Sequence, residues 1–221
     1  MHENHKMKVE IWSDVMCPFC YIGKHQFEKA LSDFEGQDNV EITWRSFELN
    51  PTIQYQEGYT LTQYLSDIKG MDKNAVVKNF DRLTEQGAQI GIDFRFDIAK
   101  VVNSRKSHKL IQAAKQQNLQ NEIEETLFHA YFTEGKNLED NKILAEIAKK
   151  VGIHFTKIEE ILESNELEEA VNADVYMAQQ VGARGVPFFV FDDAYAISGA
   201  HGADTFLNVL RTVELKSKQQ V

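Results

Sequence analysis

Cysteine, proline and positive charge are all scarce in this 221-residue chain, which contains two cysteines, three prolines, and 24 Lys and Arg against 34 Asp and Glu. Two cysteines exclude a disulfide-stapled scaffold, which needs several separated pairs. Long apolar runs are also missing, and none approaches the roughly 18 residues of a membrane span. The net charge of -10 disfavours nucleic acid and anionic membranes as partners, because both need a concentrated positive patch. The oligomeric state is left open.

The apolar content is sufficient for a folded core. Hydrophobic residues make up 43 % of the chain and aromatic residues 10 %, which argues against disorder. At roughly 150 residues per domain, the length suits one large domain or one domain that carries an insertion. The N-terminal segment Met1–Lys6 is polar and has no signal-peptide hydrophobic region, so we expect a cytoplasmic protein.

Alternating apolar residues predict strands near both ends of the chain. Near the N-terminus they lie at 7–11 and 40–44, separated by a helical pattern that begins close to the cysteines and ends near Gly36. A strand, helix and strand of this length are typical of a βαβ unit with parallel strands. Near the C-terminus, 188–191 and 195–198 flank an Asp-Asp turn and predict a hairpin, which a last helix follows. We expect these parts to form one four-stranded sheet with flanking helices.

The middle of the chain, Thr60–Val181, has helical spacing almost throughout. Asp174 lies at the edge of one of its apolar stripes and need not be buried. We therefore predict the α/β class, with one α/β domain formed by residues 1–51 and 165–221. An all-helical insertion domain, residues 52–164, interrupts it.

The motif Cys17-Pro18-Phe19-Cys20 lies where the first predicted strand meets the first helix. A thiolate is the nucleophile in disulfide exchange. A helix N-terminus favours negative charge on Cys17, because unpaired backbone N–H groups and the helix dipole point towards it. Pro18 suits the first helical turn, where its missing N–H has no partner. We predict that Cys17 attacks and that Cys20, one turn further and more shielded, is the resolving thiol.

Half of a zinc site is the competing interpretation of this motif. Zinc needs four ligands, yet the chain has no second CxxC and no HxxxH-type pair near it, and its seven histidines are scattered. A CxxC beside a βαβ pattern in a cytosolic chain favours redox chemistry. We therefore predict no metal and no bound cofactor, with redox exchange against glutathione or a thioredoxin-type dithiol.

Val186-Pro187 directly precedes the predicted hairpin. Proline cannot donate a ladder hydrogen bond, so it is expected at the start of the strand. The bond is either an ordinary trans bond or a cis bond. A cis bond would expose the Val186 backbone as an edge on which an extended peptide can pair.

Five segments in this order resemble the thioredoxin-fold DsbA-like oxidoreductases, and among them the cytosolic FrnE-like branch. They are SDVMCPFCYIGK (13–24), NSRKSHKLI (103–111), LFHAYFTEGKNLEDNKILAEIAKKVGI (127–153), GVPFFVF (185–191) and ISGAH (197–201). The similarity covers about Met7–Val213. It implies a thioredoxin-like fold with a large all-helical insertion domain.

The resemblance also implies roles for individual residues. The two cysteines act as described above, and Pro187 is the cis-proline that packs against them, with Val186 beside it. Asn103 and His108 match the motif of the helical domain and are expected near the cleft, although a surface position on a helix suits His108 equally. The substrate-binding residues predicted in this way are Pro18, Phe19, Val186, Pro187, Asn103 and His108.

Two residues of the segment SDVMCPFCYIGK, Phe19 and Asp14, bear on the expected chemistry of the cysteines. Periplasmic DsbA proteins have a histidine at the position of Phe19, which here offers no charge. We therefore expect a weaker thiolate at Cys17 and a weaker oxidant, which favours a reductase or isomerase role in a reducing cytosol. Asp14 either relays a proton to or from the thiols or bonds to nearby N–H groups in the turn, and the general preference of Asp for turns favours the second.

The predicted function is that of a cytosolic thiol–disulfide oxidoreductase, a reductase or disulfide isomerase. Its partners would be disulfide-containing proteins or peptides, or small thiols. One alternative is a glutathione-dependent enzyme of the 2-hydroxychromene-2-carboxylate isomerase or kappa transferase type, which usually has serine at the position of Cys17 and lacks the second cysteine. Another is a chaperone-like protein with a peptide groove between the domains, lined by Phe19, Val186 and residues of the helical insertion.

Overall fold

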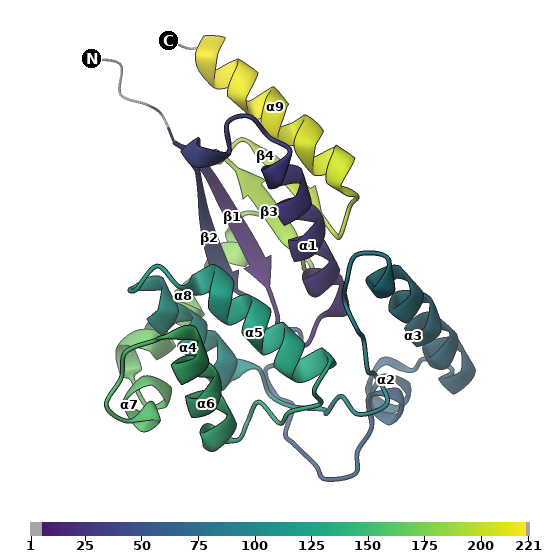
Figure 1. Cartoon of the computed structure of the whole chain (residues 1–221). Helices are drawn as coiled ribbons and strands as arrows, with labels where there is room; N and C mark the ends of the chain where they lie inside the picture. The colour runs from purple at the N-terminus through teal and green to yellow at the C-terminus, as the bar shows by residue number, and fades with distance from the viewer. Residues whose placement is uncertain (1–5, 220–221) are drawn as a thin grey trace. The chain divides into compact units, whose positions relative to one another are not determined.

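The computed structural model describes residues 6–219, which divide into two compact units (Figure 1). One unit combines Met1–Phe47 with Ala173–Val221, and the other is Glu48–Asn172. The boundaries between the units therefore differ from the predicted ones: they lie after Phe47 and Asn172 and not after residues 51 and 164. The second is displaced because α8 (Asn165–Gln180) is one continuous helix that begins in the helical unit and ends in the other. Apolar periodicity does not change along such a helix, so it cannot mark the boundary.

The unit formed by the two ends of the chain contains the four predicted strands, which form one sheet in the described residues. The strands are β1 (Met7–Ser13), β2 (Val40–Ser46), β3 (Phe188–Phe191) and β4 (Tyr195–Ser198). They lie in the order β2-β1-β3-β4, with β1 parallel to β2 and antiparallel to β3. The short helix Gln37–Asn39 precedes β2, while α1 (Pro18–Ser32) and α9 (Ala203–Gln219) are the long helices. The prediction of the α/β class with a thioredoxin-like fold is confirmed.

The central strands bury both faces of the sheet. On one face, Phe189 of β3 packs against Phe27 of α1 and Phe206 of α9, with ring centroids 4.6–5.7 Å apart. Figure 1 shows α1 and α9 side by side over this face. On the other face, Trp12 and Phe188 pack against residues at the C-terminal end of α8 and the loop after it. Alternation along β1 and β3 therefore directs successive side chains into two separate apolar layers.

Asp174 on α8 is buried, with 3 % of its surface exposed, although its spacing placed it at the edge of an apolar stripe. Its carboxylate accepts from Arg45 Nη1 at 2.8 Å and from the backbone N–H of Ser46 at 2.9 Å, and its carbonyl accepts from Trp12 Nε1 at 3.0 Å. Burial lowers the pKa of Arg45, but Asp174 and Glu10 outweigh it and raise this pKa above the ordinary value. The ion pair thus joins α8 to the sheet.

The helical unit is formed by the remaining helices. They are α2 (Leu61–Lys69), α3 (Lys73–Ala88), α4 (Arg105–Lys115), α5 (Gln120–Phe132), α6 (Asn141–Val151), α7 (Ile158–Leu162) and the first part of α8. Arg105 donates to Glu48 at 2.9 Å and also bonds to Glu168 and Asn172. Glu48 and Asn172 are the first and last residues of this unit, so Arg105 ties its two ends together.

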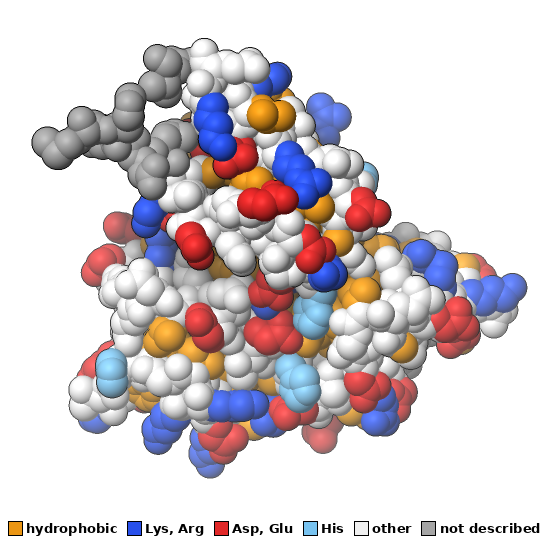
Figure 2. Space-filling view, turned by 45° about the horizontal axis from the view of Figure 1, so that its top comes forward, with side chains coloured by type: hydrophobic (Ala, Val, Ile, Leu, Met, Phe, Trp, Pro, Cys, Tyr) orange, Lys and Arg blue, Asp and Glu red, His pale blue; other side chains and the backbone are white. Residues whose placement is uncertain are grey.

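No helix within residues 6–219 is long and apolar enough to cross a membrane. On the face that Figure 2 shows, acidic and basic side chains are interspersed. The N-terminal residues 1–5, on which the expected compartment partly rests, lie outside the described residues.

We predict that Glu168 contributes to stability in a pH-dependent way. Hydrogen bonds from Arg105 and Lys109 lower the pKa of Glu168 from the ordinary 4.5 to about 2, against the opposing effect of burial. The unfolded chain therefore binds more protons between these values, and the stabilisation is lost as the pH falls from 4.5 to about 2. Because the side chain is 38 % exposed, solvent screens the pair, and Glu168→Gln should cost only about 1 kcal/mol at pH 7.

Urea unfolding of the wild type and of Glu168→Gln between neutral and strongly acidic pH measures this contribution. The difference between the two proteins should shrink to nothing as acid protonates Glu168 in both the folded and the unfolded wild type. Glu169→Gln, an exposed neighbour on α8, is the matched control. A difference that stays constant down to the lowest pH would contradict the assignment.

Candidate functional site

The candidate site is built on the turn between β1 and α1. The carbonyl of Asp14 accepts from the Cys17 N–H at 2.9 Å, and its carboxylate accepts from the Met16 N–H at 3.1 Å. Asp14 itself is fully buried. Both hydrogen bonds are typical of an Asp that stabilises a turn, which is the role that the sequence favoured for Asp14. They direct the chain so that Cys17 stands at the start of α1.

The two cysteines occupy the first turn of α1 as thiols. Cys17 caps the helix and Pro18 is its first residue, while the Cys20 N–H donates to the Cys17 carbonyl at 3.0 Å. Cys17 is 5 % exposed and Cys20 only 1 %. Of the residues between them, Pro18 is half-buried and Phe19 is exposed. Phe19 therefore presents an apolar side chain to solvent beside the two thiols.

The loop before β3 contacts the cysteine pair. The Val186–Pro187 peptide bond is cis, and the Cys17 thiol lies 3.6 Å from the Val186 carbonyl oxygen, to which it can donate. The carbonyl of Pro187 accepts from the Gly199 N–H at 2.8 Å, which holds the loop from its other side. Segments about 170 residues apart in the chain are thus brought together within one unit.

Gly23 makes this close approach sterically feasible. A Cβ at this position of α1 would lie 2.9 Å from Pro187 Cγ and 3.5 Å from Phe189 Cζ. Any larger side chain would push the loop away from the helix. The sequence contains no signal for this role, since an isolated glycine in a helical pattern has several explanations.

The two thiols have different surroundings. Burial raises the pKa of Cys20 well above its ordinary value, and the neighbouring Cys17 sulfur raises it further. The backbone N–H of Asp14 and the hydroxyl of Ser13 act in the opposite direction. Cys20 is therefore a protonated thiol at neutral pH, and it has to lose its proton before it can act as a nucleophile.

Asn103 and His108 belong to the helical unit. The Asn103 side chain donates to the carbonyls of Pro51 at 3.0 Å and Ile53 at 3.1 Å, and so fastens this segment to the start of α4. His108, on α4, is only 1 % exposed, so the alternative of a surface position is wrong. The proximity of both residues to the cysteines remains a prediction.

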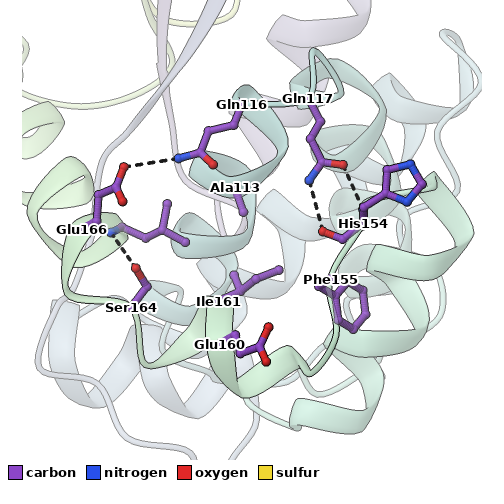
Figure 3. Close-up of a pocket in the computed structure, with 10 residues that line it drawn as sticks. Ala113, Gln116, Gln117, His154, Phe155, Glu160, Ile161, Ser164 and Glu166 are labelled. Atoms are coloured by element: carbon purple, nitrogen blue, oxygen red, sulfur yellow. Dashed lines mark hydrogen bonds between the residues drawn. The ribbon is translucent and has the colours of Figure 1, made fainter.

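The helical unit also contains a cavity of about 220 Å³ (Figure 3). On its wall, Gln117 and the backbone of His154 exchange two hydrogen bonds, of 3.3 and 2.9 Å. Glu160 and Ser164 are other polar residues of the wall, and no cysteine lines the cavity. Within residues 6–219, no group of three His, Cys, Asp or Glu side chains is arranged to hold a metal ion.

Comparison with known proteins gives results consistent with this geometry. The family model described as a DSBA-like thioredoxin domain matches residues 8–211. The crystal structure of a probable DsbA oxidoreductase from Streptomyces coelicolor is 33 % identical, with a TM-score of 0.88 over 94 % of this chain and 89 % of that chain. An uncharacterized protein of Bacillus subtilis is 26 % identical over 200 residues, which is 90 % of this chain and 92 % of its own.

More distant structures share the fold alone. The cytosolic disulfide reductase DsbM from Pseudomonas aeruginosa is 15 % identical, with a TM-score of 0.67 over 95 % of this chain and 98 % of that chain. At this level of identity the likeness extends to the arrangement of the elements and not to the chemistry of the site.

Gly23→Ala tests the packing of α1 against Pro187. Alanine in a helix interior is more stable than glycine by about 1 kcal/mol, whereas overpacking costs about 1–3 kcal/mol. Because the new Cβ would lie only 2.9 Å from the proline ring, we expect a net loss of stability and slower disulfide reduction. Thermal unfolding and an insulin reduction assay measure the two effects. The control is Gly185→Ala, whose Cβ would meet no atom within 4 Å. A Gly23→Ala protein more stable than the wild type would overturn this account.

Proposed function

Since the chain belongs to the DSBA-like thioredoxin domain family, whose members are thiol–disulfide oxidoreductases, we propose that it exchanges disulfides through Cys17 and Cys20. The observation that supports this most directly is the placement of Cys17. Cys17 caps the N-terminus of α1 and is 5 % exposed, and its sulfur lies 3.6 Å from the Val186 carbonyl oxygen. The helix N-terminus favours negative charge on this sulfur.

The reaction we propose has two exchange steps. The Cys17 thiolate attacks one sulfur of a substrate disulfide, forms a mixed disulfide and releases the other substrate sulfur as a thiolate, which takes a proton from water. Cys20 then loses its proton and attacks the Cys17 sulfur. A Cys17–Cys20 disulfide forms, and the second substrate thiol leaves with a proton. The substrate is reduced by two electrons, and the enzyme is oxidised by two.

The pair then needs an external reductant to return to the dithiol state. Glutathione or a thioredoxin-type dithiol would supply these electrons by the same exchange chemistry. In an isomerase, a thiol of the substrate itself would attack the mixed disulfide before Cys20 does. Burial of Cys20 as a protonated thiol is compatible with either outcome, because it delays the second step without preventing it.

Disulfide-bonded proteins and peptides are the substrates that best suit the surroundings of Cys17. The Val186 backbone faces this sulfur, so an extended substrate chain could pair along it. The exposed ring of Phe19 adds an apolar contact beside the same sulfur. We propose the FrnE-like branch and a cytoplasmic location for this activity, in which a weak oxidant would act mainly as a reductase or isomerase.

The glutathione-dependent isomerase alternative is less well supported. Its chemistry needs a single group at the position of Cys17, whereas this chain buries a second thiol one helical turn away. A conjugation activity that survives Cys20→Ser would revive that alternative.

Substitution of the two cysteines tests the proposal. With serine at the attacking position, insulin reduction by glutathione should fall at least about 100-fold, because a hydroxyl is a weak nucleophile at neutral pH. Cys20→Ser should instead accumulate a covalent complex with substrate, visible on non-reducing gels and released by dithiothreitol. The double variant is the control and should trap nothing. Equal residual reduction by the two single variants would sink the mechanism.

A further inference from the structure

The backbone of Val186 carries two polar groups beside Cys17. Its carbonyl oxygen lies 3.6 Å from the Cys17 sulfur, and its N–H donates to no group within residues 6–219. The next carbonyl, that of Pro187, accepts from the Gly199 N–H at 2.8 Å. Successive carbonyls of an extended chain point to opposite sides, so the Val186 carbonyl points away from this contact. Because backbone groups away from water are nearly always paired, the half-buried Val186 is an edge that lacks a backbone partner.

Val186 can pair with one residue of an extended polypeptide. The residue before a proline is restricted to extended conformations, because the proline ring disfavours the α region. In an extended residue the N–H and the carbonyl point to the same side, and one antiparallel partner residue bonds to both. The acceptor, however, is the same oxygen to which the Cys17 thiol can donate. A substrate chain and the thiol therefore compete for one carbonyl.

The contact between Cys17 and Val186 opposes ionisation of the thiol. A thiol donates to a carbonyl, whereas a thiolate has no proton to donate, and the negative end of the carbonyl dipole then faces a negative sulfur. The N-terminus of α1, which Cys17 caps, acts in the opposite direction and favours the thiolate. Of these two opposing influences on the sulfur, only the first depends on an atom to which a substrate chain can bond.

A paired substrate chain changes this balance. A thiol S–H is a weak donor, so a backbone N–H takes the Val186 carbonyl in preference to it. The amide proton then offsets the negative end of the carbonyl dipole. The thiol loses its acceptor, and the effect of the α1 N-terminus on the Cys17 sulfur is left largely unopposed.

We propose that pairing of a substrate chain with Val186 displaces the Cys17 thiol from the Val186 carbonyl and thereby promotes ionisation of the attacking sulfur. The inference rests on the proposed function, because it concerns the thiolate that attacks the substrate disulfide. In this priming step the Cys17 S–H bond breaks and its proton passes to water, while no electrons are transferred. The thiolate keeps the electron pair with which it then attacks the disulfide.

The substrates selected in this way are disulfides whose cysteine belongs to a peptide. They bring a backbone N–H to the Val186 carbonyl together with a sulfur to Cys17. A small disulfide without amide groups also reaches Cys17, but it leaves the thiol bonded to its carbonyl. Proteins and peptides are therefore favoured through the ionisation of Cys17 and not only through their binding.

A disulfide-free peptide tests the priming step without the reaction. The probe is a short segment around a cystine of insulin, with serine in place of cysteine. In Cys20→Ala, Cys17 is the one remaining thiol, and its thiolate is followed by ultraviolet absorbance. At a pH where most of Cys17 is protonated, saturating peptide should raise the thiolate-to-thiol ratio roughly tenfold, as for one hydrogen bond. Covering the sulfur has the opposite effect, because desolvation disfavours charge, so a rise cannot come from burial alone.

Single N-methylation along the peptide is the matched control. Methylation of the nitrogen that pairs with Val186 should abolish the rise. Methylation of either neighbouring nitrogen should preserve it, because successive N–H groups of a strand point to opposite sides. The proposal would be overturned by a bound peptide that leaves the thiolate fraction unchanged or lowers it, or by a rise that no methyl group abolishes. Failure of the peptide to bind to a protein that reduces insulin would overturn it as well.

The unmodified protein gives a second measurement that does not need the Cys20 variant. Its first exchange step is followed across a range of pH with a peptide disulfide and with hydroxyethyl disulfide, which has no amide group. The rate at saturating peptide reports ionisation in the complex, whereas the small disulfide reports ionisation in the free protein. The peptide profile should therefore rise at lower pH. Coincident profiles would refute the competition for the Val186 carbonyl.

The outcomes distinguish this inference from the proposed function. If the wild type fails to reduce insulin while the peptide still raises the Cys17 thiolate, the proposed function is wrong and the coupling to Val186 stands. If the wild type reduces insulin and the peptide leaves the thiolate unchanged, only the inference about Val186 fails. A protein that neither reduces insulin nor binds the peptide would contradict both.

Discussion

The burial of the C-terminal end of β1 is the constraint on which the cysteine site depends. The strand pairs with β2 along one edge and with β3 along the other, and its last residues, Trp12 and Ser13, are fully buried. The turn that follows therefore begins below the protein surface, at the fully buried Asp14. Polar groups in such a place can be satisfied only by one another. The backbone carbonyl of Asp14 accordingly accepts from the Cys17 N–H, and its carboxylate accepts from the Met16 N–H.

Depth in this turn gives the two thiols different surroundings. Cys17 caps the start of α1 and is 5 % exposed, against 1 % for Cys20. Cys20 lies one turn further in, where burial raises its pKa and keeps it protonated until it is needed. The backbone of Asp14 and the side chain of Ser13, both at the end of β1, act in the opposite direction on this pKa.

Much of this architecture could be predicted because it follows local periodicity. The alternation of Val9 and Ile11 and the run Phe188–Phe191 indicated strands that the structure contains. Features that depend on packing between distant segments could not be predicted. Asp174 is buried because Arg45, distant in sequence, pairs with it, and the spacing on its own helix does not reveal this. The importance of Gly23 likewise becomes visible only when its neighbours Pro187 and Phe189 are in place.

The position of the Val186–Pro187 loop is determined by the register of β1 against β3. Trp12 pairs with Phe188, so Pro187 falls opposite the beginning of the turn that leads to Cys17. A slip of one residue would exchange the faces of Phe188 and Phe189. Phe189 would then leave its cluster with Phe27 and Phe206, and Phe188 would leave the layer beneath α8. The two apolar layers thus enforce the register, and the register brings the Val186 carbonyl within 3.6 Å of the Cys17 sulfur. Aromatic packing remote from the thiols is in this way a determinant of their chemistry.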